Sequence, residues 1–352
     1  MNASIQEMLS YALDIGASDL HLSVGSIPMV RVHGEMKKLK LPALDITNMG
    51  KIKDDILNDN QKKIFEEKLE IDFSTALEDK GRFRVNFFNQ INGISAVFRA
   101  IPSEIKSCQE LGIPPIMNQL ALKEKGLVLL TGPTGSGKST TLAAMIDHVN
   151  ENKQNHIITI EDPVEYFHKS NNSMINQREL GQSTHSFGNA IRSALREDPD
   201  VILVGEMRDL ETIQLALTAA ETGHLVLSTL HTSSAVKTID RIIDVFPAGQ
   251  KGHIRSMLSE SLLAVIAQKL LQNKNRNGRV PACEIMIANS AIRNLIREDK
   301  IYQIPSLIQG GGQDGMQSLD QDLQRLLQQG LIERSEAIKI AENTEIFEKG
   351  VF

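Results

Sequence analysis

Residues 132–139 read GPTGSGKS, and this octapeptide sets the architecture that we expect for the rest of the chain. It follows the apolar run Leu127–Leu130 and precedes a helix-like stretch, Thr140–Val149. In a strand–loop–helix context the glycines let backbone N–H groups turn toward phosphates, Lys138 supplies a positive charge, and Ser139 offers a hydroxyl to Mg²⁺. The sequence therefore predicts a phosphate-binding loop that takes a nucleoside triphosphate.

Length, charge and composition narrow the classes of protein that this chain fits. Its 352 residues are enough for two domains, and its net charge of −6 produces no overall field that attracts DNA, RNA or anionic lipid. Cys108 and Cys283 lie outside any CxxC or Cys/His cluster, which indicates free thiols. The acidic net charge leads us to expect no binding to nucleic acid. Since no apolar run is long enough to cross a bilayer, we expect a cytoplasmic protein that reaches a membrane only through partners.

Residues 1–100 have the pattern of a small α+β domain. Ser4 and Glu7 form a capping-box pair before an apolar helical face, and residues 50–69 have the amphipathic pattern of one charged helix. Residues 101–115 are rich in proline and glycine, and we expect them to be the linker to a second domain.

A β-hairpin is expected near the end of this first domain. Residues 82–87 alternate between polar and apolar side chains, and Asn92–Gly93 is a strong two-residue turn signal that would pair Asn86 with Arg99. Like charges on one sheet face repel each other unless carboxylates or an anion lie against them, so the arginines of this hairpin serve either ion pairs or a bound phosphate. The arginines expected on one face are Arg82, Arg84 and Arg99.

Residues 116–352 alternate strand and helix patterns. This alternation predicts an α/β domain with a mostly parallel sheet and helices on both faces, followed by a helical segment beyond about residue 290. The expected strands span 127–131, 157–161, 201–205 and 225–229, and the expected helices span 139–150, 187–197, 209–222 and 249–272.

Polar side chains follow three of these strands at their carboxyl ends, where open α/β sheets bind ligands. Glu165 comes shortly after the second strand, Glu206 after the third and His231 after the fourth. A carboxylate beside a phosphate-binding loop can hold Mg²⁺ or orient the attacking water, whereas a lone acid after a strand is also an ordinary N-terminal helix charge. His231 is a better candidate phosphate sensor than His224 at the other end of its strand, although a lone histidine is more often structural.

The nucleotide expected at this loop is ATP. A guanine site would need an Asn-Lys-x-Asp motif, and Asn273–Arg276 begins correctly but lacks the aspartate. Mg²⁺ is expected at Ser139 and at Glu206, directly or through water. The residues expected to contact the nucleotide are Gly132, Pro133, Thr134, Gly135, Ser136, Gly137, Lys138, Ser139 and Thr140.

Four segments together resemble the motifs of the secretion ATPase superfamily, which drives type II secretion and type IV pili. They are similar to its Walker A motif, Asp box, atypical Walker B motif and His box, and they lie at 132–140, 157–168, 195–209 and 219–232. Within that superfamily, Ala17–Leu22 and Ala291–Glu298 make the chain resemble the type IV pilus retraction (twitching motility) ATPases, the PilT family.

The resemblance implies a homohexameric ring with a PAS-like N-terminal domain and a RecA-like P-loop NTPase domain. It implies that ATP lies between domains, that hydrolysis drives pilus retraction, and that the ring works beside the inner membrane through a pilus platform protein. The residues to which it assigns catalytic roles are Lys138, Glu165, Glu206 and His231. It also implies that arginines of the N-terminal domain reach the nucleotide; Arg84 and Arg99 are the candidates, and which of the three hairpin arginines acts there stays open.

The helix expected at 291–298 carries the segment associated with retraction. Its buried stripe would be Ile292, Leu295 and Ile296, which leaves polar residues, among them Arg293, facing outward. Those polar residues form either an ordinary solvated face or a docking surface that retraction needs and hydrolysis does not.

Several other activities share parts of this pattern. Pilus assembly and type II secretion ATPases of the same superfamily usually have a longer N-terminal region and a zinc site made of four cysteines. No such cysteine cluster appears in this sequence. A RecA-type nucleic-acid motor would predict DNA-stimulated hydrolysis that weakens with salt. A small-molecule kinase would need a phosphoryl acceptor, and a nucleotide-gated binding protein would hardly turn over.

Overall fold

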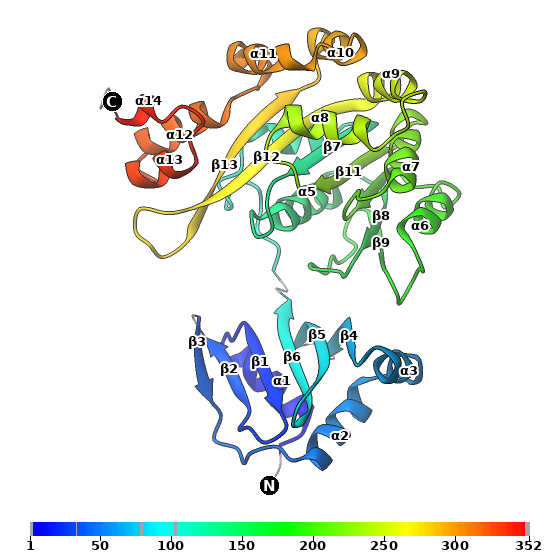
Figure 1. Cartoon of the computed structure of the whole chain (residues 1–352), viewed down its shortest axis with the longest axis vertical. Helices are drawn as coiled ribbons and strands as arrows, with labels where there is room; N and C mark the ends of the chain where they lie inside the picture. Colours follow the sequence, from blue (N-terminus) through cyan, green and yellow to red (C-terminus); the bar gives the residue numbers. More distant parts are fainter. Residues whose placement is uncertain (1–2, 33, 78–79, 102–103, 349–352) are drawn as a thin grey trace. The chain divides into compact units, whose positions relative to one another are not determined.

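The protein, seen in a computed structural model, is described over residues 3–32, 34–77, 80–101 and 104–348 as two compact units (Figure 1). The first unit comprises Met1–Glu104 together with Pro163–Phe167, and the second comprises Ile105–Asp162 together with His168–Phe352. Residues 102–103 of the expected linker and 349–352 of the expected second domain lie outside the described residues. The boundaries expected at residues 100 and 115 stay predictions.

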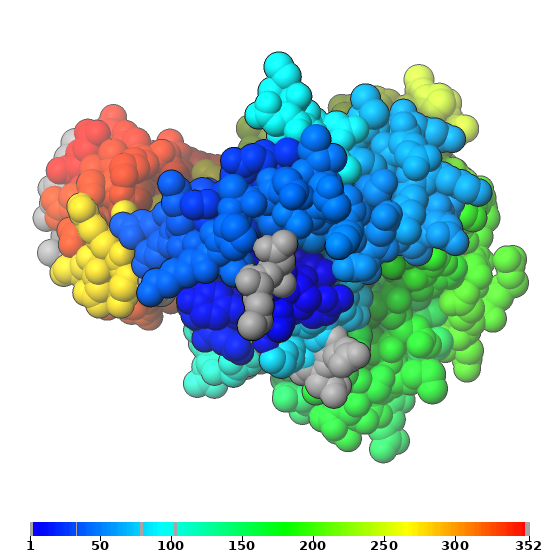
Figure 2. All heavy atoms as spheres, turned by 90° about the horizontal axis from the view of Figure 1, so that it is seen from below, coloured from blue at the N-terminus to red at the C-terminus, as the bar shows by residue number. Residues whose placement is uncertain are grey.

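The first unit is built on a six-stranded sheet, and all of its neighbouring strands are antiparallel. Its strand order is β3-β2-β1-β6-β5-β4, and Figure 2 shows the unit's surface in blue shades. Its helices bury Leu9, Met49 and Phe65 in one core with Phe83 and Phe98 of the sheet. The elements are α1 (Ile5–Asp14), β1 (Asp19–Ser23), β2 (Met29–Val32), β3 (Glu35–Lys38), α2 (Ile46–Ile56), α3 (Asp59–Lys68), β4 (Glu70–Leu77), β5 (Gly81–Gln90) and β6 (Gly93–Ile101).

The helices of this unit confirm one prediction and correct another. The expected capping box is present at α1, where the Ser4 hydroxyl accepts from the Glu7 N–H at 3.2 Å and the Glu7 carboxylate accepts from the Ser4 N–H at 2.8 Å. The single helix expected at 50–69 is wrong. The first helix ends at Ile56, and Asn58 caps a second helix, since its side chain accepts from the Gln61 N–H at 2.9 Å.

β5 and β6 form the expected hairpin with a register that differs by two residues from the prediction. The turn is Ile91–Asn92, Gly93 already belongs to β6, and Arg84 instead of Asn86 lies opposite Arg99. Gly93 has a φ of +126°, which favours glycine at the start of this strand. Because side chains alternate with a period of two, the shift leaves both arginines on the expected face.

The second unit is built on a seven-stranded sheet with the order β13-β12-β7-β11-β10-β8-β9. All neighbouring pairs are parallel except β12 with β13. Up to β11 its elements are α4 (Ile116–Ala121), β7 (Gly126–Thr131), α5 (Lys138–Asn152), β8 (His156–Glu161), β9 (Met174–Glu179), α6 (Phe187–Ala194), β10 (Val201–Val204), α7 (Leu210–Glu221) and β11 (Leu225–Leu230). They continue with α8 (Ala235–Asp244), α9 (Lys251–Ser261), β12 (Leu262–Gln272), β13 (Arg279–Ile287), α10 (Ser290–Arg297), η2 (Ile301–Gln303), α11 (Ile304–Gly310), η3 (Gly312–Asp314), α12 (Leu319–Gln328), α13 (Arg334–Ile340) and α14 (Glu345–Glu348).

Helices cover both faces of this sheet, as the alternation of patterns predicts (Figure 1). Leu127 and Leu129 of β7 belong to the core shared with α6–α11, whereas Val128 and Leu130 belong to the core shared with α4 and α5. The predicted fold class is confirmed: the second unit is an α/β domain with a mostly parallel sheet, and the first unit is a smaller N-terminal α+β domain.

The helix expected at 249–272 is wrong in its second half. α9 ends at Ser261 and the chain continues directly as β12, which is buried over most of its length. A strand buried on both faces is a continuous apolar run, and such a run has no period that distinguishes it from a buried helix. β12 lies directly beside β7, the strand that leads into the phosphate-binding loop.

Candidate nucleotide-binding site

The loop between β7 and α5 has the backbone of a phosphate cradle. Gly132, Gly135 and Gly137 have φ values of +141°, +79° and +87°, and Gly137 caps the N-terminus of α5. A Cβ at Gly132 would lie 2.3 Å from the carbonyl oxygen of Gln268. Only glycine fits this close approach, so the spacing of glycines in the motif follows from the path of the loop.

Lys138 and two hydroxyl groups make the loop suitable for an anion. The Lys138 Nζ donates to the carbonyl oxygens of Gly132 at 2.8 Å and Pro133 at 3.0 Å, and this ammonium group is mostly buried. The hydroxyl oxygens of Thr131 and Ser136 are buried with no hydrogen-bond partner in the described part of the chain. Buried polar atoms normally have partners, so these residues fit a bound phosphate group.

Gln268 on β12 joins the loop to the first turn of α5. Its side chain is 2% exposed, its Nε2 donates to the Ser136 carbonyl oxygen at 2.8 Å, and its Oε1 accepts from the Thr141 hydroxyl at 2.9 Å. Sequence reasoning missed this residue because the apolar run of its strand has no period that distinguishes it from a buried helix, and a helix was expected there. The signal that could have found it is a polar residue in the middle of the apolar run 262–271.

Two neighbouring strand ends bring a carboxylate and a histidine together. β11 lies between β7 and β10, so His231 after β11 and Glu206 after β10 emerge at the same edge of the sheet as the loop. The Nε2 of His231 lies 3.0 Å from Oε1 of Glu206, and the Nε of Arg208 lies 2.6 Å from the same oxygen. Burial raises the pKa of Glu206, but hydrogen bonds from Arg208 and the neighbouring His231 outweigh it, and the net pKa is below the usual value.

Backbone bonds between the strand ends fix the position of Glu206. The Gly205 N–H donates to the Ile160 carbonyl at 2.8 Å, the Met207 N–H donates to the Thr229 carbonyl at 3.1 Å, and the Thr229 hydroxyl donates to the Gly205 carbonyl at 2.6 Å. A residue held on both sides by neighbouring strands has little freedom to move. The Glu206 carboxylate is therefore pre-positioned by the sheet.

A cavity adjoins the first turn of α5, within the second unit. It has a volume of about 330 Å³ and is lined by Gly137, Thr140 and Gln268 of the nucleotide region and by an apolar wall. The remaining lining residues are Leu111, Ile113, Thr141, Leu270, Gly278, Arg279 and Pro281. Its apolar lining with a few polar groups is suited to the base and ribose of a nucleotide.

The other expected site residues belong to the first unit. Glu165 is an exposed residue of the segment Pro163–Phe167. The Nη2 of Arg84 lies 2.5 Å from the Asp72 carboxylate, and the Nε of Arg99 donates to Asp19 at 2.9 Å. Carboxylates, one of the two alternatives for balancing these arginines, therefore lie against both Arg84 and Arg99. The third arginine of the hairpin, Arg82, places its guanidinium carbon 5.2 Å from the centroid of the Phe167 ring.

His224 lies at the other end of β11 from His231. Its Nδ1 is 2.9 Å from the Ala219 carbonyl oxygen near the end of α7. This contact places it away from the strand ends that carry Glu206, in agreement with the preference for His231.

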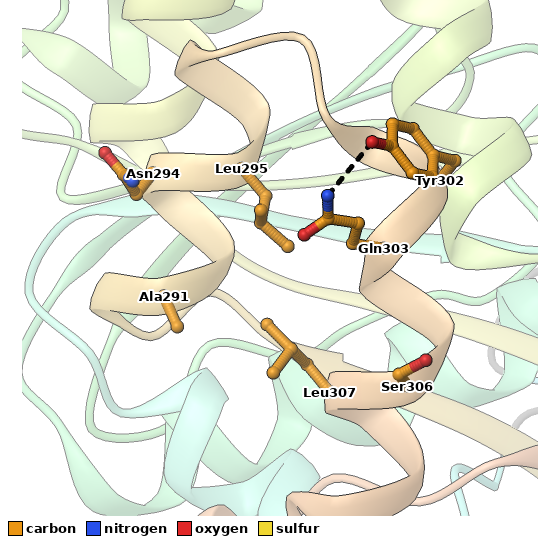
Figure 3. A pocket seen from close by; sticks show the side chains of 7 residues that line it. All are labelled: Ala291, Asn294, Leu295, Tyr302, Gln303, Ser306 and Leu307. Atoms are coloured by element: carbon orange, nitrogen blue, oxygen red, sulfur yellow. Dashed lines mark hydrogen bonds between the residues drawn. The ribbon is translucent and has the colours of Figure 1, made fainter.

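Helices α10 and α11 enclose an open hollow on the second unit (Figure 3). It has a volume of about 600 Å³, and the side chains of Leu295 and Leu307 point into it from opposite sides. The outward orientation expected for Arg293 is wrong, since this side chain is half-buried. Its Nη1 donates to the Ser259 and Glu260 carbonyls at 2.6 Å each, at the end of α9, because the last carbonyls of a helix lack intrahelical partners.

The described residues also bear on metal binding and on the membrane. No three His, Cys, Asp or Glu side chains among them lie together as a metal-binding group. Among the same residues, none of the helices has the length and apolarity needed to traverse a bilayer.

Comparison with known proteins agrees with this geometry. A family described as "Type II/IV secretion system protein" matches residues 1–336. The chain is 59% identical over 318 residues to the "Twitching motility protein" of Neisseria gonorrhoeae, covering 90% of this chain and 85% of that protein. It is 57% identical over 342 residues to the "Type IV pilus retractation ATPase PilT" of Pseudomonas aeruginosa, covering 96% and 99%.

A solved structure resembles the whole chain. The crystal structure of the pilus retraction motor PilT with bound ADP has a TM-score of 0.92 and 46% identity, covering 99% of this chain and 100% of that one. Likeness of this extent in sequence and in structure assigns the chain to one family. The chain belongs to the type II/IV secretion system protein family, and within it to the PilT group of type IV pilus retraction ATPases.

Proposed function

We propose that this chain is the subunit of a homohexameric motor that hydrolyses ATP to retract type IV pili. The observation that carries the proposal is the glycine-rich loop with its buried lysine, beside strand ends that hold Glu206 against His231. The names of the relatives, a twitching motility protein and a pilus retraction ATPase, support the pilus as the object on which the motor acts.

The residues from Gly132 to Thr140 bind the phosphates of ATP. Lys138 has its ammonium group against the loop carbonyls, where it can reach the β- and γ-phosphates, and the orphaned Ser136 hydroxyl adds a donor. Mg²⁺, held by Ser139 and by Glu206 directly or through water, neutralises charge on the phosphate oxygens when it is bound.

Glu206 orients the water that attacks the γ-phosphorus. Its low pKa, caused by Arg208 and His231 against the opposing effect of burial, keeps it as an ionised acceptor for that water. The water oxygen forms a bond to phosphorus while the bond to the bridging oxygen of ADP breaks, and the water proton leaves toward the carboxylate. His231, which shares this carboxylate, is placed to respond to the γ-phosphate.

The cavity beside α5 takes the base and ribose of the nucleotide. It adjoins Gly137 and Thr140 at the start of the helix, so a nucleotide with its phosphates on the loop would extend directly into it. Its apolar residues would stack against the adenine ring, and Arg279 is available at its wall for the ribose or phosphates.

Residues of the first unit complete the site. Glu165 is the second catalytic carboxylate, and Arg84 and Arg99 supply positive charge to the triphosphate. The Arg99 side chain is 68% exposed and is bound through its Nε, which supports a role for its outer nitrogens. In a ring these groups serve a nucleotide at a subunit boundary, and hydrolysis becomes rigid-body movement of the units.

The motor works in the cytoplasm, at the inner membrane, through a pilus platform protein. Such a partner docks at the hollow between α10 and α11, which has the exposed Tyr302 at its rim. Retraction would need this surface, whereas ATP hydrolysis would not.

The decisive experiment measures the size of the purified protein and its phosphate release together. With a non-hydrolysable ATP analogue the protein should assemble into a ring of six subunits, and with ATP it should release phosphate with no acceptor present. A lone subunit that hydrolyses ATP at the full rate would contradict the motor. Phosphate release only after an acceptor is added would indicate a kinase.

A further inference from the structure

The amide of Gln268 has a defined orientation between the phosphate loop and α5. The Ser136 carbonyl oxygen can only accept a hydrogen bond, so the Gln268 atom 2.8 Å away must be the donating Nε2. The Oε1 then accepts from the Thr141 hydroxyl at 2.9 Å. With a side chain 2% exposed, the amide satisfies its partners inside the protein.

This contact determines where the next N–H group of the loop points. The carbonyl of Ser136 and the N–H of Gly137 belong to one planar trans peptide, and in such a peptide they point in opposite directions. Since the carbonyl faces Gln268, the Gly137 N–H faces the other side of the loop. That N–H has no acceptor among the residues that the structure describes. Gly137 itself is the N-cap residue of α5.

Two glycines of the loop also lie close to Gln268. A Cβ at Gly137 would lie 2.9 Å from Nε2 of Gln268, and a Cβ at Gly132 would lie 2.3 Å from its backbone oxygen. β12 therefore contacts the loop at both ends, through backbone at Gly132 and through side chain at Ser136. A glutamine that only filled space would not need to contact the loop at these two points.

We propose that Gln268 is a positioning residue for the nucleotide: by binding the Ser136 carbonyl it directs the Gly137 N–H toward the phosphates of ATP. The residue does not itself touch the nucleotide phosphates, and it acts through the loop peptide. This inference rests on the proposed function, because it requires that the loop binds a triphosphate. It also explains why an amide interrupts the apolar sequence of β12.

The test compares two variants of the full-length chain. Gln268→Met removes both hydrogen bonds of the amide with an unbranched side chain of similar length. Lys269→Met is the matched control, since it introduces the same side chain at the next position of β12, where the Lys269 Nζ donates to the Ile340 carbonyl oxygen at 3.4 Å. Affinity for ATP and for ADP is measured by titration calorimetry, and nucleotide-free stability is measured by thermal unfolding.

Gln268→Met should weaken ATP and ADP binding roughly tenfold, as expected for one oriented hydrogen bond, whereas Lys269→Met should stay within about threefold of the parent. Unchanged affinity in folded Gln268→Met, or an equal loss in Lys269→Met, would overturn the inference. Lower thermal stability with unchanged affinity would identify a packing role and would also overturn it.

A second variant keeps the test decisive if Gln268→Met does not fold. Gln268→Glu keeps the volume and can still accept from Thr141, but its carboxylate cannot donate to Ser136. Its nucleotide affinity should be low at pH 8 and recover toward the parent at pH 6, since a buried carboxyl group that becomes protonated can donate again. Parent-like affinity at both pH values would overturn the inference. Failure of the parent chain itself to bind ATP would instead contradict the proposed function.

Discussion

The Nε2 of His231 lies 3.0 Å from Oε1 of Glu206, and this contact joins the carboxyl ends of two neighbouring parallel strands. The two residues are 25 positions apart in sequence, and the order of strands in the sheet brings them together. Arg208 holds the same carboxylate oxygen at 2.6 Å. The consequence is an ionised carboxylate with a fixed direction, beside the strand end that carries the phosphate loop.

Glu206→Gln should leave ATP binding largely intact and lower turnover by on the order of 10² or more, because the amide cannot accept the proton of the attacking water. Binding by calorimetry and steady-state phosphate release measure the two effects separately. Glu221→Gln, an exposed change at the end of α7, is the control and should behave as the parent. Near-normal hydrolysis by Glu206→Gln would refute its assignment.

An Arg84→Ala subunit mixed with a Lys138→Ala subunit should recover part of the ATPase activity that each variant lacks alone. In the mixed ring, some intact phosphate loops would lie beside a neighbour that retains its arginine. Phosphate release is measured as a function of the mixing ratio, and Arg99→Ala is tested in the same way. If mixing never restores activity for either arginine, the shared-site arrangement fails.

Arg293→Ala should destabilise the second unit by about 1–3 kcal/mol, because carbonyls at the end of α9 and at Ala288 lose a charged donor. Arg297→Ala, an exposed change on the same helix, should cost much less. Urea unfolding of the two variants tests the difference. Equal effects would mean that the contact with α9 contributes no specific stability.

Lowering the pH should destabilise the protein through His168. Burial lowers the pKa of this histidine to about 4, whereas the unfolded chain titrates near the usual value of 6.5. Between those values the unfolded state binds more protons, so the stabilising contribution is complete above pH 6.5 and is lost as the pH falls toward 4. The loss between pH 7.5 and pH 5 should be about 2 kcal/mol.

The measurement for His168 is the free energy of unfolding at the two pH values, compared between the parent and His168→Leu. The leucine variant lacks the titrating group, so its stability should fall less over the same interval. Other groups titrate in both proteins, and the comparison cancels their contribution. Identical pH slopes would show that His168 does not control this dependence.

Motifs with local causes were predictable. The glycine-rich loop, the capping box at Ser4 and the strands around 127–131 and 201–205 depend on backbone conformations and periodicities that neighbouring residues set. The shared face of Arg84 and Arg99 was also predictable despite a wrong register, because a shift of two residues preserves the side of a strand.

Contacts between distant segments were not predictable in the same way. The pairing of His231 with Glu206 depends on which strands are neighbours, and Gln268 reaches Ser136 only because β12 lies beside β7. The apolar run of β12 has no period that identifies it as a strand, and Arg293 turns inward only because the end of α9 lies beside it. The local motifs follow from the order of residues alone, because they depend on residues that are close together along the chain. The partners of buried polar groups follow only from the folded chain, because these partners depend on how the sheet and its helices pack. A buried polar group needs a hydrogen-bond partner, and the fold decides which residue supplies it.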